Sequence, residues 1–392
     1  MIAVGLAAPA WMSSIAKADV LRQAKGNKID PDGILVVCQL SGGNDGLNTV
    51  VPYADPKYYE LRPNLGIKGE NVLRITDKLG LHPELTGLEK LYKEGKVAVV
   101  QNVGYPRPNR SHFQSMDIWH MASPEKPLPT GWIGRHLDQV AAKGDANPIY
   151  ALGLSNDKPR ALLAEDASIP CFASLADIQA MVGDPDAEKR LRDISSGAMS
   201  EAERVVAAAN KSAFDAMVLL KSQLSGFAPK QEYGTSKFGA GFKQIAQLIA
   251  TSPQTRVVYF SVGGFDTHAR QAESHAALMK GFNEGLYAFQ KEMEALGKAK
   301  KLVTLVFSEF GRRSYENASG GTDHGAAAPM MLIGSPVKGG FYGPNPNLQD
   351  LNDGDLKFAI DFRQVYATAL DDWMGGDSGK VLGGKFQTLP LF

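Results

Sequence analysis

The sequence has 392 residues, of which 44% are hydrophobic and 21% are charged, and these proportions exclude a wholly disordered chain. Its 42 Lys and Arg residues balance 42 Asp and Glu residues, so we expect no nucleic-acid partner, because proteins that grasp nucleic acid carry an excess of positive charge. The two cysteines, Cys38 and Cys171, exclude a disulfide framework and a cysteine-rich zinc site.

The N-terminal segment resembles a targeting signal. Residues 1–12 are apolar and rich in small side chains, and Ala16-Lys17-Ala18 fits an A-x-A cleavage site. We interpret residues 1–18 as the remnant of an export signal whose charged beginning is missing, and residues 19–392 as one α/β domain. The alternative is a short N-terminal helix packed on the body. No run of about 20 apolar residues follows, so we expect no transmembrane span and a periplasmic or secreted protein.

Five apolar runs without polar alternation predict strands that are buried on both faces. They cover residues 34–40, 96–101, 256–262, 302–307 and 329–334. Helical patterns cover residues 83–92, 237–250 and 273–296, and a closing helix is expected over 355–373. Strands that alternate with helices predict an α/β fold with a doubly wound, mostly parallel sheet. Residues 184–226 are rich in Ala and charge and predict a helical insertion, either a lid beside the site or a scaffold pair with no gating role.

Polar side chains follow these strands. In open parallel sheets, ligands bind beyond the carboxyl ends of the strands. The first strand leads to Asp45, the second to Ser111 and His112, the third to Asp266 and His268, the fourth to Glu309, and a Gly-rich loop carries Asp323 and His324. Carboxylates and imidazoles suit Zn, Mn, Mg or Ca. We therefore predict a divalent metal ion held by Asp45, Asp266, His268, Glu309, Asp323 and His324, against the alternative of scattered caps and turns.

Several common catalytic motifs are missing from the sequence. It contains no G-x-x-x-x-G-K-[ST] phosphate loop, no G-x-G-x-x-G after the first strand, no G-x-S-x-G elbow and no H-E-x-x-H helix. These absences argue against nucleotide, dinucleotide, serine-esterase and common zinc-protease sites.

The motifs together resemble the DUF1501 family, an exported bacterial group of the alkaline phosphatase/sulfatase superfamily. The matching segments are residues 40–52, 110–113, 130–134, 264–268, 308–312 and 322–325. The resemblance implies an alkaline phosphatase-like α/β domain over residues 19–392, and export through the Tat route.

The resemblance also implies roles for single residues. Asp45, Asp266, His268 and His324 fall at ligand positions of the superfamily, and Ser111 falls at the nucleophile position. Two departures leave the metal content open at one ion, a different ion or none. The spacing Asp-Thr-His at 266–268 is shorter than the usual Asp-x-x-x-His, and Ser308-Glu309 stands where an Asp-His pair is expected. The formylglycine sulfatase sequence C/S-x-P-x-R is missing around Ser111.

The resulting expectation is a metal-dependent hydrolase that acts on phosphate or sulfate esters, with a small-molecule or polymeric anionic ester as substrate. Ser111 would attack the ester, Arg110 or Arg312 would neutralise its oxygens, and Asn44 would donate a hydrogen bond. Three alternatives stay open at this point. The chain could be a non-catalytic binding or assembly protein of the cell envelope, a Ser-His-Asp hydrolase without metal, or a fold in which Ser111 only caps a helix.

Overall fold

The computed structural model describes residues 32–144, 147–181, 189 and 214–392. The expected export signal at 1–18 lies outside these residues, and so does most of the expected insertion at 184–226. The described end of that insertion, residues 214–223, is helical. Within the described residues, no helix has the length and apolar character needed to cross a membrane.

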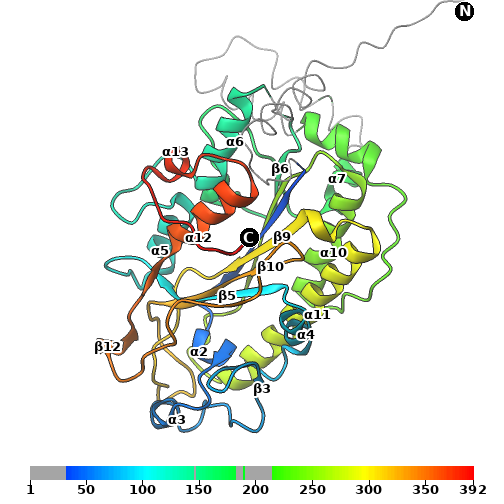
Figure 1. Cartoon of the computed structure of the whole chain (residues 1–392). Helices are drawn as coiled ribbons and strands as arrows, with labels where there is room; N and C mark the ends of the chain where they lie inside the picture. The colour runs from blue at the N-terminus through cyan, green and yellow to red at the C-terminus, as the bar shows by residue number, and fades with distance from the viewer. Residues whose placement is uncertain (1–31, 145–146, 182–188, 190–213) are drawn as a thin grey trace, which may run out of the picture.

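A nine-stranded mixed sheet runs through the centre of the described residues (Figure 1), in the order β11-β5-β10-β9-β1-β8-β6-β7, with β14 also paired to β5. Its strands are β1 (Ile34–Ser41), β5 (Val97–Gly104), β6 (Ala151–Leu154), β7 (Cys171–Phe172), β8 (Val257–Gly263), β9 (Leu302–Phe307), β10 (Ala328–Ile333), β11 (Gly340–Tyr342) and β14 (Ile360–Asp361). Smaller sheets contain β2 (Val50–Val51), β3 (Leu73–Arg74) and β4 (Gly80–Leu81), and β12 (Leu351–Asn352) with β13 (Asp355–Leu356). The expected α/β fold with a large, mostly parallel sheet is confirmed.

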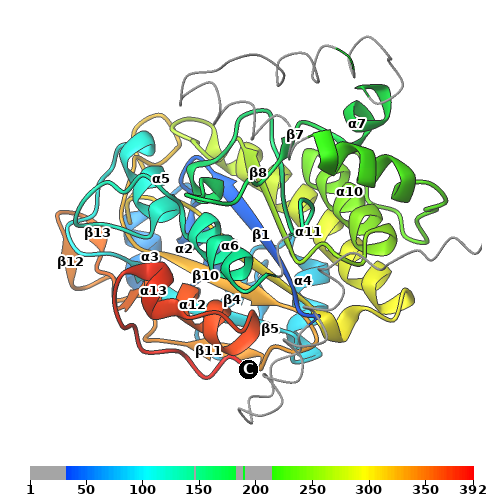
Figure 2. The ribbon, with the colours of Figure 1, turned by 90° about the horizontal axis from the view of Figure 1, so that it is seen from above.

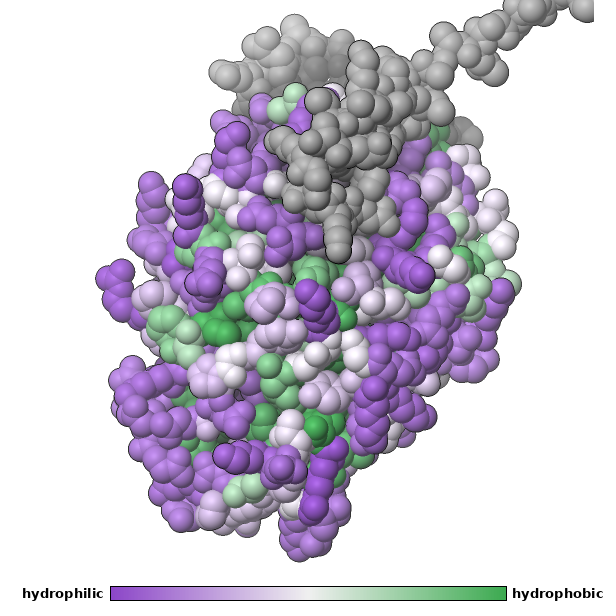
Figure 3. Space-filling view, in the orientation of Figure 1, coloured by the Kyte–Doolittle hydropathy of each residue, from purple (hydrophilic) through white to green (hydrophobic). Residues whose placement is uncertain are grey.

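The sheet is buried on both faces because its central strands are mainly apolar on both sides. In β1, Val36 and Cys38 belong to one hydrophobic core and Leu35 and Val37 to the other, as the period of two in a strand requires. Figure 2 shows helices on both faces of the sheet. In Figure 3, hydrophilic side chains cover most of the visible described surface, with hydrophobic groups in separate patches between them.

Two groups of helices cover the two cores. One core packs against α4 (Thr86–Lys93), α10 (Lys237–Thr251) and α11 (Gln271–Ala295), close to the three predicted helices. The other packs against α5 (His112–Met121), α6 (Trp132–Ala142), α12 (Phe362–Thr368) and α13 (Ser378–Leu382). The remaining helices are α2 (Gly46–Thr49), α3 (Pro56–Leu61), η1 (Arg160–Leu162), α7 (Leu175–Met181), η2 (Ala299–Lys301) and η3 (Ala369–Trp373).

The expected closing helix over 355–373 is wrong in its first third. Residues 355–356 and 360–361 form β13 and β14, and α12 begins only after Asp361. Asp361 and Gln364 form a reciprocal capping box there, which fixes the helix start.

One strand of the sheet runs against its neighbours. β10 is antiparallel to both β5 and β9, whereas β1 pairs in parallel with β8 and β9. The segment before β10 therefore opens on the same edge as the carboxyl ends of the parallel strands. This reversal brings residues 308–327, between β9 and β10, to the edge where the sequence predicts a site.

Candidate metal centre

Loops that are far apart in the sequence are tied together at this edge. The backbone N–H of Gly42, after β1, donates to Oε1 of Glu309, after β9, at 2.8 Å. The Nδ1 atom of His324 lies 2.7 Å from the backbone oxygen of Arg110, in the loop before α5. The expected gathering of loops at one edge of the sheet is thus present in the structure.

Three imidazoles converge on one carboxylate oxygen. Oδ1 of Asp266 lies 2.9 Å from Nε2 of His268, 3.0 Å from Nε2 of His324 and 3.3 Å from Nε2 of His112. One ligand atom from each of His112, Asp266 and His324 lies within 4.8 Å of the others. We call His112, His268, His324 and Asp266 together the histidine cluster.

The opposite ring nitrogen of each histidine lies against an oxygen. These Nδ1 contacts are His324 to the Arg110 carbonyl at 2.7 Å, His112 to Glu309 Oε1 at 2.9 Å, and His268 to Asp323 Oδ1 at 3.1 Å. A carbonyl can only accept, so a neutral His324 carries its proton on Nδ1 and turns the Nε2 lone pair toward Asp266. Metal-binding histidines are commonly held in this way by a carbonyl or carboxylate behind the ring.

The donor set fits a divalent cation. Three imidazole nitrogens and a carboxylate oxygen are ligands that Zn²⁺ and related transition metals accept. The Nε2 atom of His112 is buried and makes no well-aligned hydrogen bond, although it lies 3.3 Å from Oδ1 of Asp266. In a neutral ring with its proton on Nδ1, facing Glu309, the Nε2 lone pair is available to a cation. His112, His324 and Asp266 could therefore hold a divalent cation, and His268 lies against the same Asp266 oxygen.

Arg312 stabilises the charged form of the Asp266 carboxylate. Burial tends to raise the pKa of Asp266, but a 2.6 Å ion pair with Arg312 and the contact with His324 hold that pKa well below its usual range. The contact with Glu309 raises the pKa of His112, against the effect of burial. The Arg312 side chain is fully buried, and its Nε also donates to the Gly43 carbonyl at 2.7 Å. Arg312 therefore fixes Asp266 against the loop that follows β1.

Glu309 and Asp323 lie behind the histidines. Glu309 is fully buried and accepts from Gly42 and His112, and Asp323 lies against His268 and Asn317. The sequence predicted both residues as ligands. In the structure their contacts are those of residues that orient a ligand.

Asp45 occupies a separate buried pocket. Its Oδ2 pairs with Nη1 of Arg62 at 2.6 Å, both side chains are fully buried, and its Oδ1 accepts from the backbone of Leu47 and Asn48 at the start of α2. Burial raises the pKa of Asp45, but Arg62 outweighs it and the net pKa is lowered. Asp45, which the sequence predicts as a metal ligand, is thus paired with an arginine in the structure.

Arg62 makes three further hydrogen bonds. Its Nη1 donates to Oδ1 of Asn48 at 2.7 Å, its Nε to the Ser314 carbonyl at 3.0 Å, and its Nη2 to the Arg313 carbonyl at 2.9 Å. The buried guanidinium of Arg62 thus neutralises Asp45, as that of Arg312 neutralises Asp266.

The remaining predicted residues have different surroundings. Ser111 is the N-cap residue of α5, but its hydroxyl makes no capping hydrogen bond. The guanidinium of Arg110 pairs with Asp355 at 2.6 Å and with Asp353 at 3.0 Å. Asn44 is buried, donates to Oγ1 of Thr49 at 2.9 Å and lies 3.0 Å from Nε2 of His275.

Sequence reasoning missed two residues of this region. His112 was placed at the right sheet edge but left out of the predicted ligands. Its signal was its place beside Ser111, as the first residue of the helix that follows a buried strand. Arg62 gave no signal, because an arginine in a charged stretch has the pattern of a surface residue.

The chain was compared with known proteins at the level of sequence and of structure. No curated protein matches the sequence. Solved structures with a similar arrangement include the C-terminal periplasmic domain of EcEptC from Escherichia coli in complex with Zn (9% identity, 78% of this chain and 73% of that one, TM-score 0.37). Others are the lipoteichoic acid synthase LtaP from Listeria monocytogenes (10% identity, 94% and 80%, TM-score 0.36) and an alkaline phosphatase from the Antarctic bacterium TAB5 (10% identity, 80% and 95%, TM-score 0.32).

The family model described as "Protein of unknown function (DUF1501)" matches residues 33–385, which span the whole sheet and every residue of the histidine cluster. The chain therefore belongs to the DUF1501 family.

Proposed function

We propose that the protein is an exported, metal-dependent hydrolase of phosphate or sulfate esters, with Ser111 as its nucleophile. The observation that carries this proposal is the convergence of three histidine Nε2 atoms on one Asp266 oxygen. Several imidazoles with their far nitrogens held by oxygens are a common feature of metal centres, and they are uncommon in a simple ion pair or turn.

A bound divalent cation supplies Lewis-acid polarisation of an ester oxygen and lowers the pKa of a nearby hydroxyl. His112, His268, His324 and Asp266 would hold it. Arg312 positions Asp266, and Glu309 positions His112 through Nδ1.

The position of Ser111 at the start of α5 supports its proposed role as nucleophile. It directly precedes His112, its side chain is half-buried, and its hydroxyl makes no capping hydrogen bond at the start of the ten-residue helix α5. The first N–H groups of that helix point toward an anion placed there. In the reaction, a bond forms between Ser111 Oγ and phosphorus or sulfur, the ester oxygen leaves and takes up a proton, and Ser111 gives up its own proton. Water then hydrolyses the seryl ester and restores the hydroxyl.

The substrate would be a small-molecule or polymeric anionic ester, met in the periplasm or outside the cell. The alternative, a non-catalytic envelope protein with the same fold, draws on one observation. Arg62 neutralises Asp45, so the carboxylate that the resemblance assigns to a metal ion already has a buried cationic partner. A single ion in the histidine cluster is compatible with either function, and activity must decide between them.

The test combines element analysis with an ester screen on the purified full chain. We expect one Zn, Mn, Mg or Ca ion per chain, and hydrolysis of a phosphate or sulfate ester that a chelator abolishes. Ser111→Ala should lose the activity and keep the ion, whereas Ser319→Ala, at an exposed serine, should change neither. Stoichiometric metal without hydrolysis of any ester would support the binding protein instead. Inhibition by a serine-directed phosphonate together with indifference to chelators would support a metal-free serine hydrolase.

A further inference from the structure

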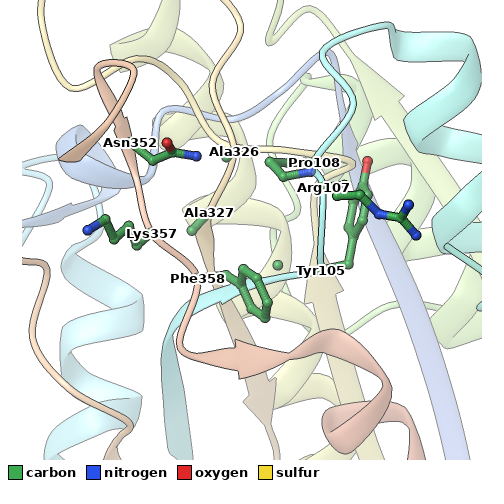
Figure 4. A pocket seen from close by; sticks show the side chains of 9 residues that line it. Tyr105, Arg107, Pro108, Ala326, Ala327, Asn352, Lys357 and Phe358 are labelled. Carbon is green, nitrogen blue, oxygen red and sulfur yellow. The ribbon is translucent and has the colours of Figure 1, made fainter.

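A cavity of about 380 Å³ opens between the end of β5 and the segment that follows β13 (Figure 4). Its lining is mainly apolar and includes Tyr105, Pro108, Ala326, Ala327 and Phe358. Figure 4 shows the rings of Tyr105 and Phe358 on either side of this space, with the charged ends of Arg107 and Lys357 extending away from its centre. A cavity of this size and character fits an apolar group as large as an aromatic ring.

The two aromatic walls of the cavity are held differently. The hydroxyl of the buried Tyr105 accepts from the backbone N–H of Asn109 at 3.0 Å and lies 2.8 Å from Oγ of Ser115, so its ring is fixed. Phe358 is 37% exposed, and its Cβ lies so close to the backbone of Gly104 that a Cβ there would be 2.8 Å away. The fixed Tyr105 ring can bind an apolar group without an entropic cost for ordering that wall.

The cavity lies next to the histidine cluster along two segments of chain. Ala326 is two residues beyond His324, and Pro108 is three residues before Ser111. Two residues span at most about 7 Å and three at most about 11 Å, so both walls are within the length of a small ester of the cluster.

A hydrogen-bond chain also joins the two places. Ser115, which contacts the Tyr105 hydroxyl, donates to the backbone oxygen of Glu309 at 2.5 Å. Glu309 in turn holds His112. One wall of the cavity and one histidine of the cluster are therefore set by the same buried group.

We propose that this cavity binds the apolar alcohol part of the substrate, a group as large as an aromatic ring, while the phosphate or sulfate lies at the histidine cluster. This proposal rests on the proposed function and narrows its substrate class to esters of apolar alcohols. The positions of the cationic side chains near the cavity, Arg107 and Lys357, agree with an apolar ligand there. Lys357 is paired with Asp350, and Arg107 is exposed at the rim, so neither places a charge in the middle of the cavity.

The test measures binding and hydrolysis separately. Binding of 2-naphthol, the alcohol half of a substrate, is followed by ligand-observed NMR titration. Hydrolysis is compared between 2-naphthyl and methyl esters of phosphate and sulfate. Ala326→Phe should fill the cavity, and Ala240→Phe, at an exposed position on α10, is its matched control. Phe358→Ala removes one wall and serves as a second variant. Thermal unfolding and metal content show whether each variant keeps its fold and its centre.

We expect 2-naphthol to bind the wild type, and Ala326→Phe to weaken that binding by about tenfold or more, because an apolar pocket discriminates by at least this factor when a group no longer fits. Phe358→Ala should weaken it too, and Ala240→Phe should leave it unchanged. The 2-naphthyl ester should be hydrolysed faster than the methyl ester, and Ala326→Phe should remove that preference.

The outcomes separate the two proposals. If both esters are hydrolysed equally well and Ala326→Phe changes nothing, the cavity proposal is overturned and the hydrolase stands. If no ester is hydrolysed but 2-naphthol binds and Ala326→Phe weakens it, the apolar binding site stands and the hydrolase is overturned. If 2-naphthol does not bind the wild type, the cavity proposal is overturned whatever the activity.

Discussion

Replacing Arg62 by methionine tests the buried pair that separates Asp45 from the histidine cluster. The variant keeps a long apolar side chain but leaves the Asp45 carboxylate buried without its 2.6 Å partner. Both side chains are fully buried, so water does not screen the lost charge. Removing one partner of such a pair costs about 3–5 kcal/mol, a large part of the 5–15 kcal/mol that stabilises a typical protein.

The assay is a double-variant cycle in urea, with Arg62→Met, Asp45→Asn and the combination. We expect the combined variant to be more stable than Arg62→Met alone, because it carries no unpaired buried charge. The pH dependence gives a second check. The folded-state pKa of Asp45 is lowered, so its stabilisation is present above its unfolded pKa of about 4 and is lost as the pH falls below that value.

The reasoning is refuted if Arg62→Met costs less than about 1 kcal/mol, the range of an exposed pair. It is also refuted if the two single costs simply add in the combined variant. Metal content should stay at the wild-type level in Arg62→Met, because the histidine cluster uses neither residue. A loss of the ion from the folded Arg62→Met variant would show that Arg62 supports the metal centre, contrary to this reasoning.

Three further predictions concern the cluster and its surroundings. Glu309→Gln removes the carboxylate behind one histidine and should weaken metal binding about 10- to 100-fold, measured by competition with a chelator. Gly42→Ala should also weaken metal binding, because its φ of +118° is strained for alanine and its Cβ would lie 2.5 Å from the backbone nitrogen of Asp266; Gly320→Ala, with φ of +66° and nothing within 4 Å, is the control that should not. His120 is buried, which lowers its pKa to about 4, so the unfolded chain binds its proton first and the free energy of unfolding should fall by up to about 1.4 kcal/mol per pH unit from pH 6.5 toward pH 4. His120→Gln should reduce that slope in acid unfolding curves, and an unchanged slope would contradict the assignment.

The strands were predictable because burial on both faces leaves a strong signal. Residues 34–40 and 302–307 are apolar without alternation, and they form β1 and β9 at the centre of the sheet. The direction of β10 was not predictable, because an apolar run has the same composition whichever way it lies. The false helix start at 355 has a similar cause, since β13 and β14 are too short to leave a pattern.

The sequence was sufficient to predict at which edge of the sheet the site lies, but not which side chains contact one another there. The strand ends predict that Asp266, His268 and His324 lie near one another, and in the structure both histidines lie within 3.0 Å of Asp266. Which predicted carboxylate contacts the histidines depends on the other side chains that pack beside it in the folded structure. Asp45 lies beside Arg62, which reaches it from 17 positions along the chain. Such pairing depends on tertiary contacts that spacing alone does not encode.

The reversed strand β10 has a consequence for how this fold can vary. Because β9 and β10 are neighbours, the segment 308–327 leaves and re-enters the sheet at adjacent points. A loop whose ends are already held side by side gains length at little entropic cost. Insertions in this segment would leave both strands where they are, so relatives of this protein could acquire new recognition surfaces beside this edge while their sheets stay the same.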